Sequence, residues 1–243
     1  MSELITRTKA DELIKSGVTE MSLSRYGMRS QQKLSECSAL LAHATQMESK
    51  MFTYQVEVGD RINSIVKPRK NNILSRIFGG SEEVISRDDL MKRIDDLSIS
   101  LVYAEREFML SNMKLERIKE RTDIVLEELK EQSEIAFLIA EQTTGLDERA
   151  RDTARIRSRE LMLSTEVATT LSLSLSVIMS NIASSLEKVR IIQSDFVPVW
   201  EKITEGMENW ENRMSELRKA AEAAKDVINP EKEDAGIENS PEP

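Results

Sequence analysis

Residues Asp88–Gln142 read DDLMKRIDDLSISLVYAEREFMLSNMKLERIKERTDIVLEELKEQSEIAFLIAEQ and contain neither glycine nor proline. Alternating steps of four and three residues from Leu90 reach fifteen positions, and twelve of them are apolar. These positions are Leu90, Ile94, Leu97, Leu101, Ala104, Phe108, Ser111, Leu115, Ile118, Thr122, Val125, Leu129, Gln132, Ala136 and Ile139. An apolar period of 3.5 residues held over about seven heptads is typical of a coiled coil. One helix of this length would be roughly 80 Å long and could bury its seam only against other helices.

The same spacing continues on both sides of this stretch. It predicts a helix from Ser30, which is a suitable N-cap, to Val66. A short turn at Thr144–Asp147 leads into a second long helix, which Asp147 can cap, so the two long helices should lie antiparallel. Pro198 should kink or break the pattern, which then resumes in a last helix that ends near Ile228. The sequence therefore predicts an all-α, elongated antiparallel helical bundle with long coiled-coil helices.

Composition and pattern divide the chain into five parts. They are a loosely ordered N-terminal arm (1–29), an amphipathic helix (30–66), a basic and apolar linker (67–87), a long coiled-coil helical core (88–228) and a disordered acidic tail (229–243).

Charge and cysteine content bound the partners and the compartment. The net charge is −9, which disfavours nucleic-acid binding because phosphate contacts need a surplus of Lys and Arg. Cys37 is the single cysteine, so no disulfide can form within the chain, as suits a reducing compartment. The N-terminus lacks the basic and apolar regions of a signal peptide. We expect a cytoplasmic protein.

The residue types of enzyme sites are scarce. His43 is the only histidine and lies six residues from Cys37, a spacing that does not place both on one helix face, so we predict no zinc site. No Ser-His-acid triad is indicated, and Gly79-Gly80 lacks the Gly-Lys-Ser/Thr of a phosphate loop. The carboxylates along Asp88–Glu141 fall mostly outside the apolar seam, where they solvate the helix. We expect no catalytic residue, no cofactor and no metal, and therefore no enzyme.

Two polar residues are candidates for burial in the second long helix. Arg157 is the one charge at a seam position, where it could pair with a carboxylate or extend to water. Asn181 lies inside an uncharged stretch and is the best candidate for a buried polar residue that fixes helix register. We predict structural roles for both.

The linker joins a basic run to an apolar one. Its candidate interaction residues are the cations and apolar side chains Lys67, Arg69, Lys70, Arg76, Ile77 and Phe78. Cations beside Ile and Phe suit docking to a partner or peripheral contact with an anionic membrane. The alternative is a short helix that folds back onto the bundle.

Residues Val167–Leu186 are 20 residues without a charge, the length of a membrane span, but nine of them are Ser, Thr or Asn. The absence of charge predicts a central bundle helix that is buried on several sides. Conditional insertion into a membrane is the alternative.

Several short patterns carry a family resemblance. Arg157-x-x-Glu160-Leu161, Ile178-x-x-Asn181, Leu186-x-x-Val189 and Leu129-x-x-Gln132-x-x-x-Ala136 resemble steps in the toxic-anion (tellurite) resistance family, the TelA-like proteins. The resemblance covers about residues 67–215 and implies a cytoplasmic, non-enzymatic helical protein linked to resistance to tellurite or related stress, acting through protein or membrane partners. It supplies no catalytic residues.

Two other functions fit the same sequence. The chain could be a homo-oligomeric coiled-coil scaffold, because long heptad helices need partner helices. It could also be a helical protein that inserts Val167–Leu186 into membranes under some condition.

Overall fold

The heptad stretch forms the long helix that its spacing predicts. A computed structural model describes residues 2–66, 87–142, 146–205 and 210–228. In this structure the heptad stretch is helix α5, Arg87–Glu141. Thirteen of the fifteen seam positions are buried, and the other two, Ile118 and Gln132, are partly exposed. Without glycine or proline, no residue in this stretch interrupts the backbone hydrogen bonds of the helix.

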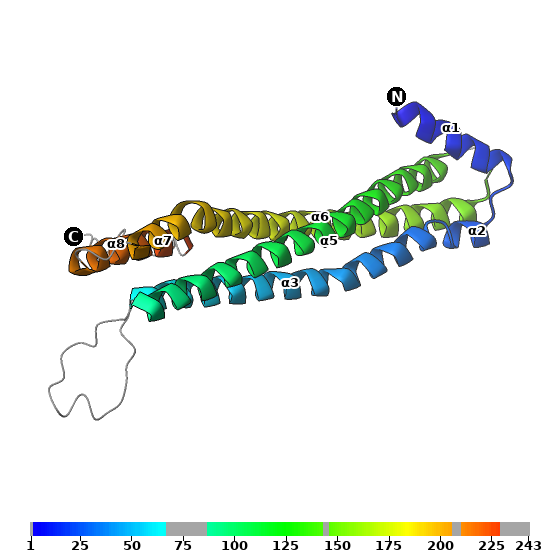
Figure 1. Cartoon of the computed structure of the whole chain (residues 1–243). Coiled ribbons are helices and arrows are strands. Elements are labelled where there is room, and N and C mark those ends of the chain that lie inside the picture. The colour runs from blue at the N-terminus through cyan, green and yellow to red at the C-terminus, as the bar shows by residue number, and fades with distance from the viewer. Residues whose placement is uncertain (1, 67–86, 143–145, 206–209, 229–243) are drawn as a thin grey trace, which may run out of the picture. The chain divides into compact units, whose positions relative to one another are not determined.

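Every regular element in the described ranges is helical, which confirms the all-α prediction and the helical bundle (Figure 1). The elements are α1 (Ser2–Lys15), α2 (Glu20–Ser24), α3 (Met28–Val66), α5 (Arg87–Glu141), α6 (Glu148–Ile191), the π-helical turn η1 (Ile192–Phe196), α7 (Val197–Glu205) and α8 (Trp210–Ile228).

The chain divides into two compact units. Unit 1 comprises Met1–Gln46 and Met113–Ser180, and unit 2 comprises Met47–Asn112 and Asn181–Pro243. The three long helices α3, α5 and α6 each contribute one segment to each unit.

Helices α5 and α6 are antiparallel within unit 1, as the short turn between them predicts. The hydroxyls of Ser133 and Ser158 each donate to the other residue's backbone carbonyl, at 3.3 and 3.1 Å. Ten residues earlier on α5, Asp123 accepts from Ser172, fourteen residues later on α6. The turn also has the expected cap, since the Asp147 carboxylate accepts from the backbone N–H of Ala150 at 2.6 Å.

Helix α3 is also antiparallel to α5 in unit 1. Ser30 donates to Glu128 at 3.0 Å, and Glu36, further along α3, accepts from Arg121, earlier on α5. The prediction that Ser30 caps this helix is wrong, because α3 begins at Met28 and the Ser30 hydroxyl bonds to α5 instead.

The N-terminal residues are ordered helices, which corrects the expectation of a loosely ordered arm. Ala10 of α1 and Leu23 of α2 are almost fully buried and belong to a core cluster with Ile139 of α5 and Ala154 of α6. The small apolar stripe of α1 was too short to reveal this packing in the sequence, because the residues that cover it are more than a hundred positions away.

Unit 2 is built from the other segments of the long helices together with η1, α7 and α8. Helix α3 is parallel to α6 here, because Glu48 accepts from Asn181 and Gln55 donates to Ser185, both at 2.7 Å and at a similar sequence offset. Trp200 of α7 is fully buried in this unit.

Pro198 does not break the helix. The backbone takes one π-helical turn over Ile192–Phe196, in which the N–H of Val197 donates to the carbonyl of Ile192, and α7 continues from Val197. A π turn is a recognised way to absorb a local defect inside a helix. The last helix predicted from the sequence covers α7 and α8, and α8 ends at Ile228 as predicted, while residues 206–209 lie outside the described residues.

The uncharged stretch of α6 is not buried on several sides, so that prediction is wrong. In unit 1, Val167, Leu173 and Val177 are 54%, 63% and 60% exposed. Thr169 and Ser176 donate their hydroxyls to the backbone carbonyls four residues earlier, both at 2.9 Å. These hydroxyls therefore have hydrogen-bond partners within the helix, whether the side chain is buried or exposed.

The predictions for the linker up to residue 86 and for the acidic tail at 229–243 lie outside the described residues.

Candidate functional site

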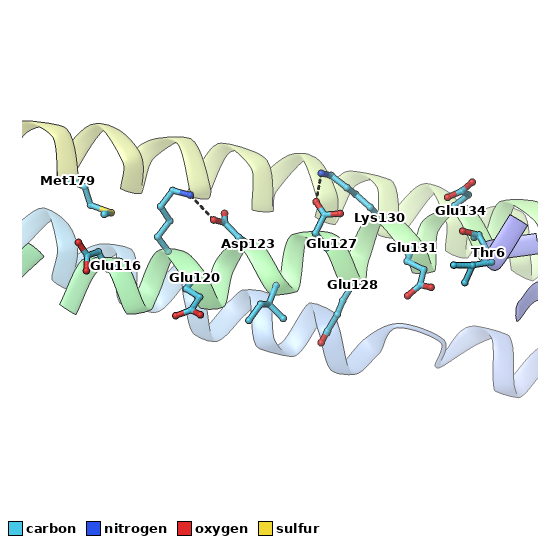
Figure 2. A pocket seen from close by; sticks show the side chains of 13 residues that line it. Thr6, Glu116, Glu120, Asp123, Glu127, Glu128, Lys130, Glu131, Glu134 and Met179 are labelled. Carbon is cyan, nitrogen blue, oxygen red and sulfur yellow. Dashed lines mark hydrogen bonds and ion pairs between the residues drawn. The ribbon is translucent and has the colours of Figure 1, made fainter. Parts of the chain in front are cut away.

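Unit 1 contains an acidic groove along α5. Its volume is about 1130 Å³. It is lined by Ile5, Thr6, Glu116, Lys119, Glu120, Asp123, Ile124, Glu127, Glu128, Lys130, Glu131, Glu134 and Met179. Thr6 of α1 lies at one end and Met179 of α6 at the other (Figure 2). We call this feature the α5 groove.

The charge of the α5 groove is strongly negative. Seven carboxylates and two lysines line it, which gives a formal charge of −5 from these residues. Most of the carboxylates recur at three- or four-residue steps, so α5 presents them on one side of the helix. The sequence predicted only that these carboxylates lie outside the apolar seam. Their repeated spacing could have indicated one acidic surface, but solvated helix faces commonly carry the same pattern.

Several groove carboxylates are paired with lysines. Lys119 bonds Asp123 at 2.6 Å and Lys130 bonds Glu127 at 2.7 Å (Figure 2). Burial raises the pKa of Asp123, but hydrogen bonds from Lys119 and Ser172 outweigh it, so the net pKa is lowered. Asp123 is therefore ionised at neutral pH.

Glu128 connects the groove to α3. Its carboxylate accepts from Lys33 at 2.7 and 2.9 Å and from Ser30 at 3.0 Å. The hydrogen bond from Lys33 is the main cause that holds the pKa of Glu128 below its ordinary value of 4.5, against the opposing effect of desolvation. Glu128 is thus an ionised link between two helices.

A Glu128→Gln variant should lose less stability in acid than the wild type does. Because the folded pKa of Glu128 lies below its unfolded value, ionisation stabilises the fold above about pH 4.5, and this stabilisation disappears as the pH falls further. Melting temperatures measured from pH 7 to pH 3 should therefore fall less steeply in the variant. Glu134→Gln, at an exposed position of the same groove, is the control for the removal of one carboxylate. Equal slopes for Glu128→Gln and wild type would contradict the assignment.

The chemistry available in the groove is limited. Its described lining contains no histidine and no cysteine, and His43 is an exposed residue of α3. Within the described ranges, no group of three or more His, Cys, Asp or Glu side chains is placed to hold a metal ion. The arrangement suits electrostatic attraction of cationic groups and repels anions.

Arg157 is buried, as the sequence predicted. Its side chain is 7% exposed, and its guanidinium donates to the backbone carbonyl of Tyr26, to Gln31 at 2.7 Å and to Glu160 at 2.6 Å. Gln31 in turn donates to Ser164 of α6 at 2.8 Å. The planar guanidinium satisfies three acceptors at once, so Arg157 links the α2–α3 turn to α6.

Asn181 is exposed, so its prediction as a buried polar residue is wrong. It lies in unit 2, and its amide donates to Glu48 of α3 at 2.7 Å. The buried polar contact between these helices is made by Ser185, which is 8% exposed and accepts from Gln55. An uncharged stretch cannot reveal which of its polar residues faces inward, because the charge pattern that would orient the helix is missing.

The candidate interaction residues of the linker lie outside the described residues. They are Lys67, Arg69, Lys70, Arg76, Ile77 and Phe78.

One described helix is long and apolar enough to cross a membrane. It runs over Glu148–Thr204, and 28% of its most apolar 18-residue window is buried within the structure. The criterion is length and composition, which core helices also meet.

No known protein family, curated protein or solved structure matches this chain.

Proposed function

We propose that this chain is a non-enzymatic helical interaction protein of the TelA-like type, which contributes to resistance to toxic anions such as tellurite by binding protein partners in the cytoplasm. The observation that carries the proposal is the exposed apolar face of α6 in unit 1. This face consists of apolar side chains that are 54–63% exposed: Ile156, Leu163, Val167, Leu173 and Val177. A contiguous exposed apolar surface is typical of a protein-interaction site.

Charge supports partner binding over direct capture of the toxic anion. Tellurite is an oxyanion, and the α5 groove has seven carboxylates against two lysines. Coulomb repulsion would exclude an oxyanion from such a groove. Resistance would therefore come from an assembly in which this protein takes part.

Growth on graded tellurite tests the proposal. A strain that lacks the gene should grow at lower tellurite concentrations than the parent, and the wild-type chain should restore growth. Leu173→Lys should restore it poorly, since a cation on the apolar face weakens partner binding. Phe137→Lys is the matched control, because Phe137 of α5 is 54% exposed and lies off this face. Equal growth of deletion strain and parent would reject the resistance function.

A homo-oligomeric coiled-coil scaffold is the second candidate. It rests on the exposed apolar face of α6 in unit 1, because the heptad positions of α5 are already buried within the chain. A defined oligomer together with unchanged tellurite sensitivity would select this function.

Membrane contact is the third candidate, supported by the apolar character of the helix over Glu148–Thr204. Release of dye from liposomes would select it. Peripheral docking through Ile77 and Phe78 would instead show as vesicle co-sedimentation that Ile77→Glu and Phe78→Glu abolish.

A further inference from the structure

The exposed apolar residues of α6 are arranged symmetrically about Thr170. Val167 and Leu173 lie three residues before and after it, and Leu163 and Val177 lie seven residues before and after it. All four side chains are 54–63% exposed, and Thr170 is exposed as well. Steps of three and four residues keep these positions on one stripe of the helix, which we call the Thr170 seam.

This arrangement is complementary to itself when two copies of the helix are antiparallel. With a two-fold axis at Thr170, Leu163 of one copy faces Val177 of the other, and Val167 faces Leu173. Thr170 then faces its own counterpart. A surface that pairs with itself in this way is the isologous interface of a two-fold dimer.

The flanking charges are compatible with the same pairing. Around the same axis, Glu166 of one copy lies opposite Ser174 of the other, and Glu160 lies opposite Ser180. No carboxylate of the described α6 segment in unit 1 meets a carboxylate, because residues 167–180 carry no charge. A parallel pairing would instead place Glu160 and Glu166 each against its own copy, which costs free energy.

We propose that a second copy of this chain docks on the Thr170 seam, α6 against α6 and antiparallel. The inference rests on the proposed function as an interaction protein and names one of its partners. The seam from Leu163 to Val177 is about 21 Å long, so it buries less area than a standard protein interface. We therefore expect a reversible dimer that dissociates on dilution through the micromolar range.

Disulfide trapping at the axis tests this geometry. Packed helices lie about 8–10 Å apart, which brings two cysteines on the axis within bonding distance. Thr170→Cys is compared with Thr45→Cys, because both threonines are exposed and donate to the carbonyl four residues earlier, at 3.0 and 3.1 Å. The native Cys37 is fully buried and stays in both variants, with the wild-type chain as background.

Mild oxidation at about 20 μM protein should cross-link Thr170→Cys at least about tenfold faster than Thr45→Cys, since a docked pair raises the effective thiol concentration to the millimolar range. Equal cross-linking of the two variants would overturn the proposal.

A charge pair tests the register. Leu163→Lys should shift the sedimentation profile to monomer, because each introduced cation faces Val177 of the other copy. Adding Val177→Glu should restore the dimer, since every introduced ammonium then faces an introduced carboxylate. A double variant that is as monomeric as Leu163→Lys would reject this pairing.

The two proposals fail separately. Tellurite resistance without preferential Thr170→Cys cross-linking would reject the dimer alone. Preferential cross-linking in a chain whose deletion leaves tellurite sensitivity unchanged would retain the dimer and reject the resistance function.

Discussion

Replacing Arg157 by alanine is expected to lower the free energy of unfolding by about 3 kcal/mol, because three acceptors lose the buried guanidinium that bonds them. The Arg157 side chain is 7% exposed, and its guanidinium bonds the carbonyl of Tyr26 and the side chains of Gln31 and Glu160. Alanine also leaves the volume of the arginine side chain unfilled. Urea unfolding followed by circular dichroism at 222 nm measures the change.

Two neighbouring variants separate the buried network from a simple ion pair. Glu160→Gln should cost less than about 1 kcal/mol, since the Glu160 side chain is 51% exposed. Arg157→Lys should recover only a minor part of the loss, because an ammonium cannot reach three divergent acceptors as a planar guanidinium does. If Arg157→Ala and Glu160→Gln cost the same, the contacts with Tyr26 and Gln31 contribute nothing.

The fold was largely predictable because its signal is periodic and local. Residues from Leu90 to Ile139 repeat one spacing, and a helix places every such residue on one stripe whatever covers it. Helix boundaries followed from the same rule together with turn residues such as Asp147, whose cap the structure confirms. The short helices α1 and α2 were not identified as core elements because their apolar partners come from α5 and α6.

The sites were less predictable because they depend on which residues meet. Arg157 could be singled out as a charge in an apolar seam, but its acceptors Tyr26 and Gln31 lie in a region that the sequence described as loosely ordered. The symmetric spacing around Thr170 was present in the sequence as well. It gained meaning only when the structure showed that these side chains are exposed.

Gly27 provides the second large effect. Its φ is +74°, a backbone conformation that residues other than glycine rarely adopt. Gly27 lies in the turn that presents the Tyr26 carbonyl to Arg157. A Cβ added there would lie 2.6 Å from a Leu161 methyl and 2.9 Å from the Gln132 side-chain oxygen. Leu161 is fully buried and has little room to move. Gly27→Ala is therefore expected to cost about 2–4 kcal/mol, from backbone strain and overpacking together.

Gly17 supplies the control that separates these two causes. Its φ is +84°, but nothing lies within 4 Å of an added Cβ, so Gly17→Ala should cost only the strain of about 1–2 kcal/mol. A double-mutant cycle then tests the contact itself. Gly27→Ala combined with Leu161→Ala should cost at least about 1 kcal/mol less than the sum of the single changes, because the shortened side chain makes room for the added methyl. Additive costs, or equal losses of stability for Gly27→Ala and Gly17→Ala, would mean that Leu161 does not restrict position 27. Contact with α6 would then not be the reason for glycine at this position.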